Sequence, residues 1–253
     1  MFGDPTLFFG VCASIVAAAI STAGIITVAA AGDWARRNSS YLSALAVGLL
    51  TVAVLFHLLP EAAFEAKDAR IALAWVAGGF ATMVLIGIAV EISVHQRSDG
   101  AALTFGYASI IALGVHSFID GFIYAIVFTE DTFTGWFSIL GLLFHEFPEG
   151  VIAFFLLSSA GLSRFRSLLF AFIASSLTTF SGALLAAWVL SRNIEPAMEA
   201  LLGTAAGALL YVLIFHLGPH AAKTPNKQGY LVAMVGVALA TAALIFNMTA
   251  GAH

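Results

Sequence analysis

The chain has little charge and almost no cysteine, and both shortages narrow its class. Only 9% of its 253 residues are charged, 61% are hydrophobic, and the mean hydropathy is +1.01. Soluble domains carry about 25% charged residues, so this composition predicts a polytopic membrane protein. The one cysteine, Cys12, excludes an intramolecular disulfide framework and a cysteine-based metal cluster. Any metal site must therefore use histidine and carboxylate.

Other absences exclude further classes. The net charge is only −4 and there is no polybasic tract, so nucleic acid is not an expected partner. The first apolar stretch has no basic segment before it, and we interpret it as a membrane span rather than a cleaved signal. Long linkers and low-complexity segments are absent from the sequence. We therefore expect a single transmembrane domain over residues 1–253.

Long apolar stretches recur along the whole chain. Stretches of about 20 residues are needed to cross a bilayer as helix, and the sequence offers eight candidates between polar breaks. We expect an all-α membrane protein with eight transmembrane helices. Their approximate ranges are 6–31, 41–64, 71–95, 101–128, 134–159, 167–191, 196–221 and 228–250.

The basic residues predict the orientation of these spans. Cytoplasmic loops are enriched in Lys and Arg. The loops after the first, third, fifth and seventh ranges hold Arg36, Arg37, Arg97, Arg164, Arg166, Lys223 and Lys227, whereas the opposite side holds Lys67, Arg70 and Arg192. The first set is expected in the cytoplasm. An even number of spans then places both termini outside.

Two short sequence echoes predict an internal repeat. Phe-His-Leu-Leu-Pro-Glu at 56–61 reappears as Phe-His-Leu-Gly-Pro-His at 215–220, in a span that crosses in the opposite direction. The segment 116–121 is likewise echoed by 145–150 in the antiparallel neighbouring span. Both pairs fit an inverted repeat relating spans one to three to spans six to eight around spans four and five. Transporters place substrate at such a repeat interface.

Ionisable side chains gather near the middle of spans four and five, with no Lys or Arg beside them. His116 and Asp120 are four residues apart, as are His145 and Glu149, so each pair lies on one helix face. Each uncompensated carboxylate at a helix centre costs roughly 2.5 to 3.5 kcal/mol. Two facing pairs therefore predict a four-ligand cage for a cation, with Glu146 next to it.

The donor types narrow the choice of ion. Imidazole nitrogen with carboxylate oxygen suits Zn²⁺ and also accepts Cd²⁺, Fe²⁺, Mn²⁺ or Co²⁺, whereas Ca²⁺ and Mg²⁺ prefer more oxygens. Ser117 and Glu146 each follow a histidine and are rotated about 100° from it, where they border a second cation position. A structural hydrogen-bond network of protonated acids is the alternative without any ion.

Two further functions use the same residues. A proton or small-solute transporter would use the carboxylates without metal. An intramembrane metallohydrolase would use His145, Glu146 and Glu149 as metal and base, although Glu149 replaces the second histidine of the His-Glu-x-x-His pattern. We expect a transporter and not an enzyme. Polar residues near the ends of other spans are candidates for an access or exit path, namely His57, Glu61, Glu91, His95, His216 and His220.

The motifs His-Ser-Phe-Ile-Asp-Gly at 116–121 and His-Glu-Phe-Pro-Glu-Gly at 145–150 resemble those of the ZIP family of divalent metal transporters. The resemblance extends to the eight-span layout and to Leu-Pro-Glu at 59–61. It implies a bacterial member in the cytoplasmic (inner) membrane, working as a homodimer in the lipid bilayer. The implied activity is inward Zn²⁺ transport by an elevator-like movement. The implied primary ligands are His116, Asp120, His145 and Glu149, with Ser117 and Glu146 at a neighbouring site.

The chain also departs from that family. Some relatives supply an acidic second-site ligand from span six, where this chain has only hydroxyls. The cytoplasmic loop between spans three and four is short and not His-rich, so regulation through it is not expected. His220 stands where an acid is often found. The span-six hydroxyls are Ser175, Ser176, Thr178, Thr179 and Ser181.

Overall fold

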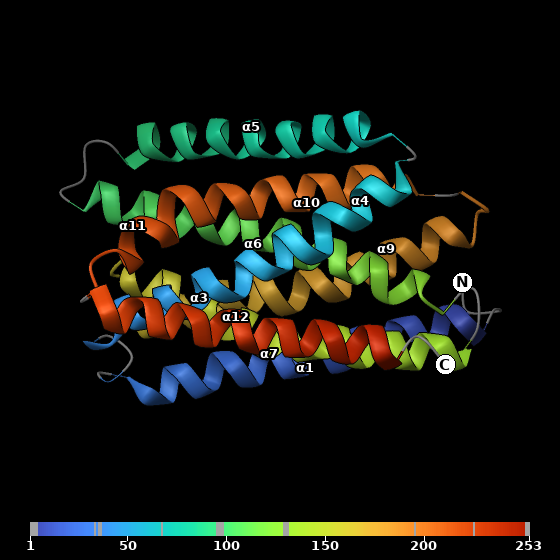
Figure 1. Ribbon diagram of the computed structural model, residues 1–253, viewed down its shortest axis with the longest axis horizontal. Coiled ribbons are helices and arrows are strands. Elements are labelled where there is room, and N and C mark those ends of the chain that lie inside the picture. Colours follow the sequence, from blue (N-terminus) through green and yellow to red (C-terminus); the bar gives the residue numbers. More distant parts are fainter. Residues whose placement is uncertain are drawn as a thin grey trace.

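The computed structural model describes residues 5–32, 34, 37–66, 68–94, 99–128, 132–194, 196–224 and 226–250. These residues are helical almost throughout and contain no strand, which confirms the all-α class for the described part. Long helices run side by side along the longest axis (Figure 1). His95, Arg97, Arg36 and Lys67, all named from the sequence, lie outside the described residues.

The helical segments follow the expected apolar stretches closely. The largest displacement of an expected end is at α8, which begins at Arg164 rather than at residue 167. Three of the runs contain a π-helical segment, labelled η. The elements are α1 (Pro5–Ala31), α3 (Ser39–Val52), η1 (Ala53–Leu58), α4 (Leu59–Glu65), α5 (Ala69–Val94), α6 (Gly100–Ile126), α7 (Thr132–Ser159), α8 (Arg164–Ala171), η2 (Phe172–Leu177), α9 (Thr178–Leu190), α10 (Met198–Val212), η3 (Leu213–Leu217), α11 (Gly218–Ala221) and α12 (Asn226–Ala250).

Membrane crossing is supported by length and composition. At 1.5 Å per residue, a helix of about 20 residues crosses the hydrocarbon core. α7 and α12 have 28 and 25 residues, which is also long enough. Six helical runs in the described part meet both criteria: Leu7–Ala31, Ser40–Glu65, Ala69–Val94, Gly100–Ile126, Arg164–Leu190 and Met198–Ala221.

Helix α6 lies in the interior of the bundle. In its most apolar stretch 72% of the residues are buried, compared with 28% in α5. The most extensive helix pairings are α5 with α10, α6 with α9, α1 with α7, and α3 with α12. Polar side chains on α6 therefore face protein rather than lipid, as intramembrane ionisable groups require.

Two glycines set how closely the central helices approach their neighbours. A Cβ added to Gly121 on α6 would lie 2.1 Å from the carbonyl oxygen of Thr179. A Cβ added to Gly150 on α7 would lie 2.0 Å from that of Ser21 on α1. Such backbone contact is possible only without a side chain, as at other small-residue interfaces in membranes. Each glycine directly follows an acid, so the close contacts fix the depth and rotation of Asp120 and Glu149.

The π-helical turns η1 and η3 occupy matching places in their runs. The Leu59 N–H bonds to the Val54 oxygen, five residues earlier, and the Gly218 N–H bonds to the Leu213 oxygen in the same way. In each case a proline follows directly, Pro60 or Pro219, which cannot donate a backbone hydrogen bond. The widened turns absorb that break without ending the helix, and each contains a histidine.

We predict that Gly121→Val destabilises the protein by about 3 kcal/mol, because the added side chain meets backbone that cannot rotate away. The measurement is thermal or denaturant unfolding of the purified chain in detergent. Gly78→Val is the matched control, since nothing lies within 4 Å of its added Cβ, and its effect should stay within about 0.5 kcal/mol. Equal stability of both variants would show that the close contact is not needed.

Candidate metal centre

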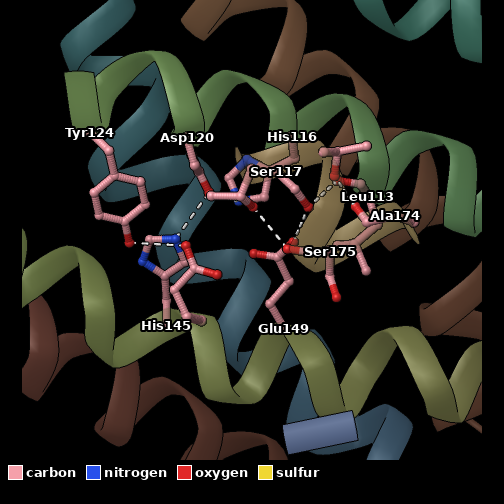
Figure 2. A network of polar contacts seen from close by, with 12 residues as sticks. Leu113, His116, Ser117, Asp120, Tyr124, His145, Glu149, Ala174 and Ser175 are labelled. Atoms are coloured by element: carbon pink, nitrogen blue, oxygen red, sulfur yellow. Dashed lines mark hydrogen bonds and ion pairs between the residues drawn. The ribbon is translucent and has the colours of Figure 1, made fainter. Parts of the chain in front are cut away.

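Two helices supply the central polar cluster. His116 and Asp120 lie one turn apart on α6, and His145 and Glu149 lie one turn apart on α7. Figure 2 shows the two pairs facing each other across the gap between these helices. The helical spacing expected from the sequence thus brings all four side chains together, with one ligand atom of each within 4.8 Å of all the others.

Asp120 connects the two helices. Its Oδ2 atom lies 3.2 Å from His116 Nε2 on the same helix and 3.1 Å from His145 Nε2 on α7. Ligands of a tetrahedral zinc ion, bonded at about 2.0 to 2.2 Å, are separated by about 3.3 Å. The separations of 3.2 and 3.1 Å are therefore close to the edges of a tetrahedral ligand set.

The cluster is shielded from the surroundings on most sides. His116, Asp120 and Glu149 are 6%, 2% and 5% exposed, whereas the His145 side chain is 34% exposed. An ion would therefore reach the cluster past His145. Among the described residues, Asp120 forms ion pairs with His116 and His145 alone. No Lys or Arg charge there offsets the carboxylates.

Glu149 is only partly satisfied. The Ser117 hydroxyl contacts both Glu149 Oε1 and the Leu113 carbonyl oxygen, the latter at 2.9 Å, and its single proton serves one of them at a time. Among the described residues, Glu149 Oε2 has no hydrogen-bond partner although it is buried. A buried acceptor without a partner is costly, and a cation in the cluster would satisfy it.

Glu146 has a partner that the sequence did not indicate. The hydroxyl of Tyr124 on α6 donates a hydrogen bond of 2.9 Å to Glu146 Oε1, and both residues are fully buried. Glu146 is not part of the four-residue group, and its Oε2 has no hydrogen-bond partner among the described residues. The sequence did contain one signal for Tyr124, namely its position four residues after Asp120 and eight residues after His116, which places it on the same face of the helix as these two residues.

The span-six hydroxyls serve helix packing. Ser175 and Ser176 in η2 pair with Ser21 and Thr22 of α1 at 2.9 and 3.0 Å. Thr179 donates to the Ser175 carbonyl oxygen at 2.8 Å. Thr178 and Ser181 donate to carbonyl oxygens of their own helix. The hydroxyls of Ser175 and Ser176 therefore attach η2 to α1.

The path residues are not members of the four-residue group. His57 Nδ1 in η1 is 3.3 Å from Glu61 Oε2, and both side chains are partly exposed. His216 in η3 is buried, with Nδ1 at 2.6 Å from Ser109 Oγ and 3.1 Å from the Phe105 carbonyl oxygen. The His220 ring stacks on Phe105, as does that of His216. Glu91 is exposed on α5, and His95 falls outside the described residues.

Comparison with known proteins identifies the family. The family described as "ZIP Zinc transporter" matches residues 91–244, which is more than half of the chain and includes the whole cluster. The chain belongs to the ZIP family. Members of the ZIP family are transporters rather than enzymes, so the metallohydrolase alternative is not supported.

The sequence identity to two individual relatives is below 30%. This ZIP-family chain is 25% identical over 207 residues to zinc transporter ZIP13 of Pongo abelii, covering 75% of the chain and 60% of that protein. It is 29% identical over 134 residues to IAA-alanine resistance protein 1 of Arabidopsis thaliana, covering 49% of the chain and 28% of that protein. The chain thus spans less than two thirds of the length of either relative.

We predict that Asp120→Ala weakens Zn²⁺ binding by about 100-fold or more, because it removes the oxygen shared by both histidines. Isothermal titration of the purified protein in detergent measures the affinity. Glu65→Gln is the control, as it neutralises an exposed carboxylate at the end of α4 and should leave the affinity unchanged. Unchanged Zn²⁺ affinity of Asp120→Ala would show that the cluster is not the metal site.

Proposed function

We propose that the chain imports divalent transition metal ions, above all Zn²⁺, into the cytoplasm through a site formed by His116, Asp120, His145 and Glu149. The observation that carries this proposal is the convergence of four ligand atoms within 4.8 Å between two central helices. Membership of the ZIP family supports divalent metal as the cargo. Cd²⁺, Fe²⁺, Mn²⁺ and Co²⁺ fit the same donor set.

Charge balance favours a divalent ion. Two neutral imidazoles and the ionised carboxylates of Asp120 and Glu149 carry a charge of −2, which one M²⁺ ion cancels. The loaded site is then neutral, and moving it through a low-dielectric environment avoids the cost of an unpaired charge. On release, protons return to the carboxylates and histidines, because metal binding and protonation compete for the same atoms.

The proposed topology has eight spans, with α7 and α12 added to the six runs named above. Helix α1 begins and α12 ends at the same end of the bundle (Figure 1), as an even number of crossings requires. The excess of basic residues in the loops after the first, third, fifth and seventh spans supports a cytoplasmic position for those loops, with both termini outside. We assign the protein to a bacterial cytoplasmic membrane as a homodimer on the strength of the family resemblance alone.

The helix pairings support an inverted repeat. An inverted repeat relates α1 to α8–α9, α3–α4 to α10–α11, α5 to α12 and α6 to α7. When each element is replaced by its counterpart, the α6–α9 pairing becomes the α7–α1 pairing. The same exchange turns the α5–α10 pairing into α12–α3, so the four most extensive pairings form two matched sets. The π-helical turns η1 and η3 with their prolines also exchange places. Repeats of this kind form the moving and fixed halves of many transporters.

Two helix groups follow from this pattern. The site group comprises α1, α6, α7 and α8–α9, and the frame group comprises α3–α4, α5, α10–α11 and α12. An open apolar groove of about 760 Å³ lies where α6, η2 and α9 of the site group meet α10 of the frame group, lined in part by Ile111, Phe118, Ile173 and Leu201. The four most extensive helix pairings all lie within a group rather than between the groups, which favours an elevator-like sliding of the site group with the bound ion.

We predict that His116→Ala and Glu149→Ala each reduce Zn²⁺ uptake into proteoliposomes by at least about tenfold, because each loses one of four ligands. Glu65→Gln should transport like the wild type. Uptake is followed with an entrapped zinc dye in a panel that also contains Cd²⁺, Fe²⁺, Mn²⁺ and Co²⁺. Equal transport by all variants would show that these residues do not form the transport site. Proton or solute flux that persists under strong chelation would favour a transporter that does not use metal.

We further predict that a cross-link between the two helix groups stops transport. In a Cys12→Ser background, Ser109→Cys with His216→Cys joins α6 to η3, whereas Ser21→Cys with Ser175→Cys joins α1 to η2 within the site group. Oxidation should block uptake only in the first pair, and reduction should restore it to the level before oxidation. Undiminished uptake by the oxidised first pair, with the cross-link verified by mass spectrometry, contradicts relative sliding.

A further inference from the structure

A tyrosine on α6 donates a hydrogen bond to the third buried carboxylate. Tyr124 is fully buried, and its hydroxyl donates a 2.9 Å hydrogen bond to Glu146 Oε1 across the α6–α7 interface. Figure 2 shows Tyr124 beyond Asp120 along α6, with its ring beside His145 and its hydroxyl directed toward α7. Among the described residues, the Glu146 carboxylate accepts this hydrogen bond through Oε1, and its Oε2 atom has no partner.

Glu146 lies beside two residues of the cluster along α7. It lies next to His145 and three residues before Glu149, and positions three apart on a helix are neighbours on its surface. Its Oε2 atom is buried without a hydrogen-bond partner among the described residues, so it retains capacity to bind a cation. Yet Glu146 is absent from the group of four convergent residues. The hydrogen bond from Tyr124 gives the Oε1 atom of Glu146 a partner outside that group.

We propose that Tyr124 is a positioning residue that keeps Glu146 out of the metal site and thereby limits the site to four ligands. This inference rests on the proposed function of the cluster as a metal site. A set of two nitrogens and two carboxylates suits the tetrahedral geometry of Zn²⁺. An added carboxylate would raise the ligand number and the oxygen share, which suits Mn²⁺ better. Tyr124 would therefore determine metal specificity without touching the ion.

Tyr124→Phe tests the proposal, because it removes one hydroxyl and keeps the ring. We expect the ratio of Zn²⁺ to Mn²⁺ affinity, measured by titration of the full chain in detergent, to fall about tenfold, equivalent to about 1.4 kcal/mol. The absorption of bound Co²⁺ should also weaken, since tetrahedral Co²⁺ absorbs more strongly than Co²⁺ with more ligands. A purely structural role for Tyr124 would change neither the ratio nor the spectrum.

Two comparisons isolate the mechanism. Tyr107→Phe removes a hydroxyl elsewhere on α6 and should leave the affinity ratio unchanged. In a Glu146→Gln background, Tyr124→Phe should cause no further change in the ratio, because the carboxylate that it releases is gone. Tyr124→Leu, which also lacks the hydroxyl, replaces Tyr124→Phe if melting curves show that the latter does not fold.

The outcomes separate this inference from the proposed function. If the wild type binds neither Zn²⁺, Mn²⁺ nor Co²⁺, the metal site itself is wrong. If the wild type binds these ions but Tyr124→Phe leaves the ratio and the Co²⁺ spectrum unchanged, only the role of Tyr124 is overturned. A change in ratio that persists in the Glu146→Gln background also overturns it, because the effect would not then pass through Glu146.

Discussion

The Oδ2 atom of Asp120 is approached by imidazoles from two helices, and the arrangement of the bundle centre depends on that shared contact. His116 reaches it from the same helix and His145 from α7, at nearly equal distances. A carboxylate in this position is costly in a membrane interior unless positive charge is supplied. Since the described contacts provide histidine and no Lys or Arg, the missing charge has to come from protons or from a metal ion.

The packing of small residues makes this contact possible. Gly121 and Gly150 let α6 and α7 press against α9 and α1, and each glycine adjoins a carboxylate of the cluster. The same residues that permit close helix approach therefore also limit how far the acids can rotate. Precise placement of ligands on helices, rather than on loops, is what a selective metal site requires.

The periodicity of the sequence predicted most of the helix ranges and the spacing of the ligands within each of the two central helices. Hydrophobic runs of membrane length predicted the helix ranges, and the spacing of four residues placed each His above its acid. Spacing within one helix says nothing about the rotation of α6 relative to α7, so the Tyr124–Glu146 contact could not be predicted. The π-helical turns at His57 and His216 were missed for a related reason, because a proline predicts a break but not how the backbone absorbs it.

The three buried carboxylates have different roles because their partners differ. Asp120 faces two histidines, Glu149 faces a serine and keeps one oxygen unpaired, and Glu146 is held by a tyrosine. If all three acids were ionised around one divalent ion, the site would carry a net charge of −1 and moving it through the bilayer would again be costly. The Tyr124 hydroxyl instead gives Glu146 Oε1 a partner outside the four-residue group, which leaves Asp120 and Glu149 to balance the charge of the ion.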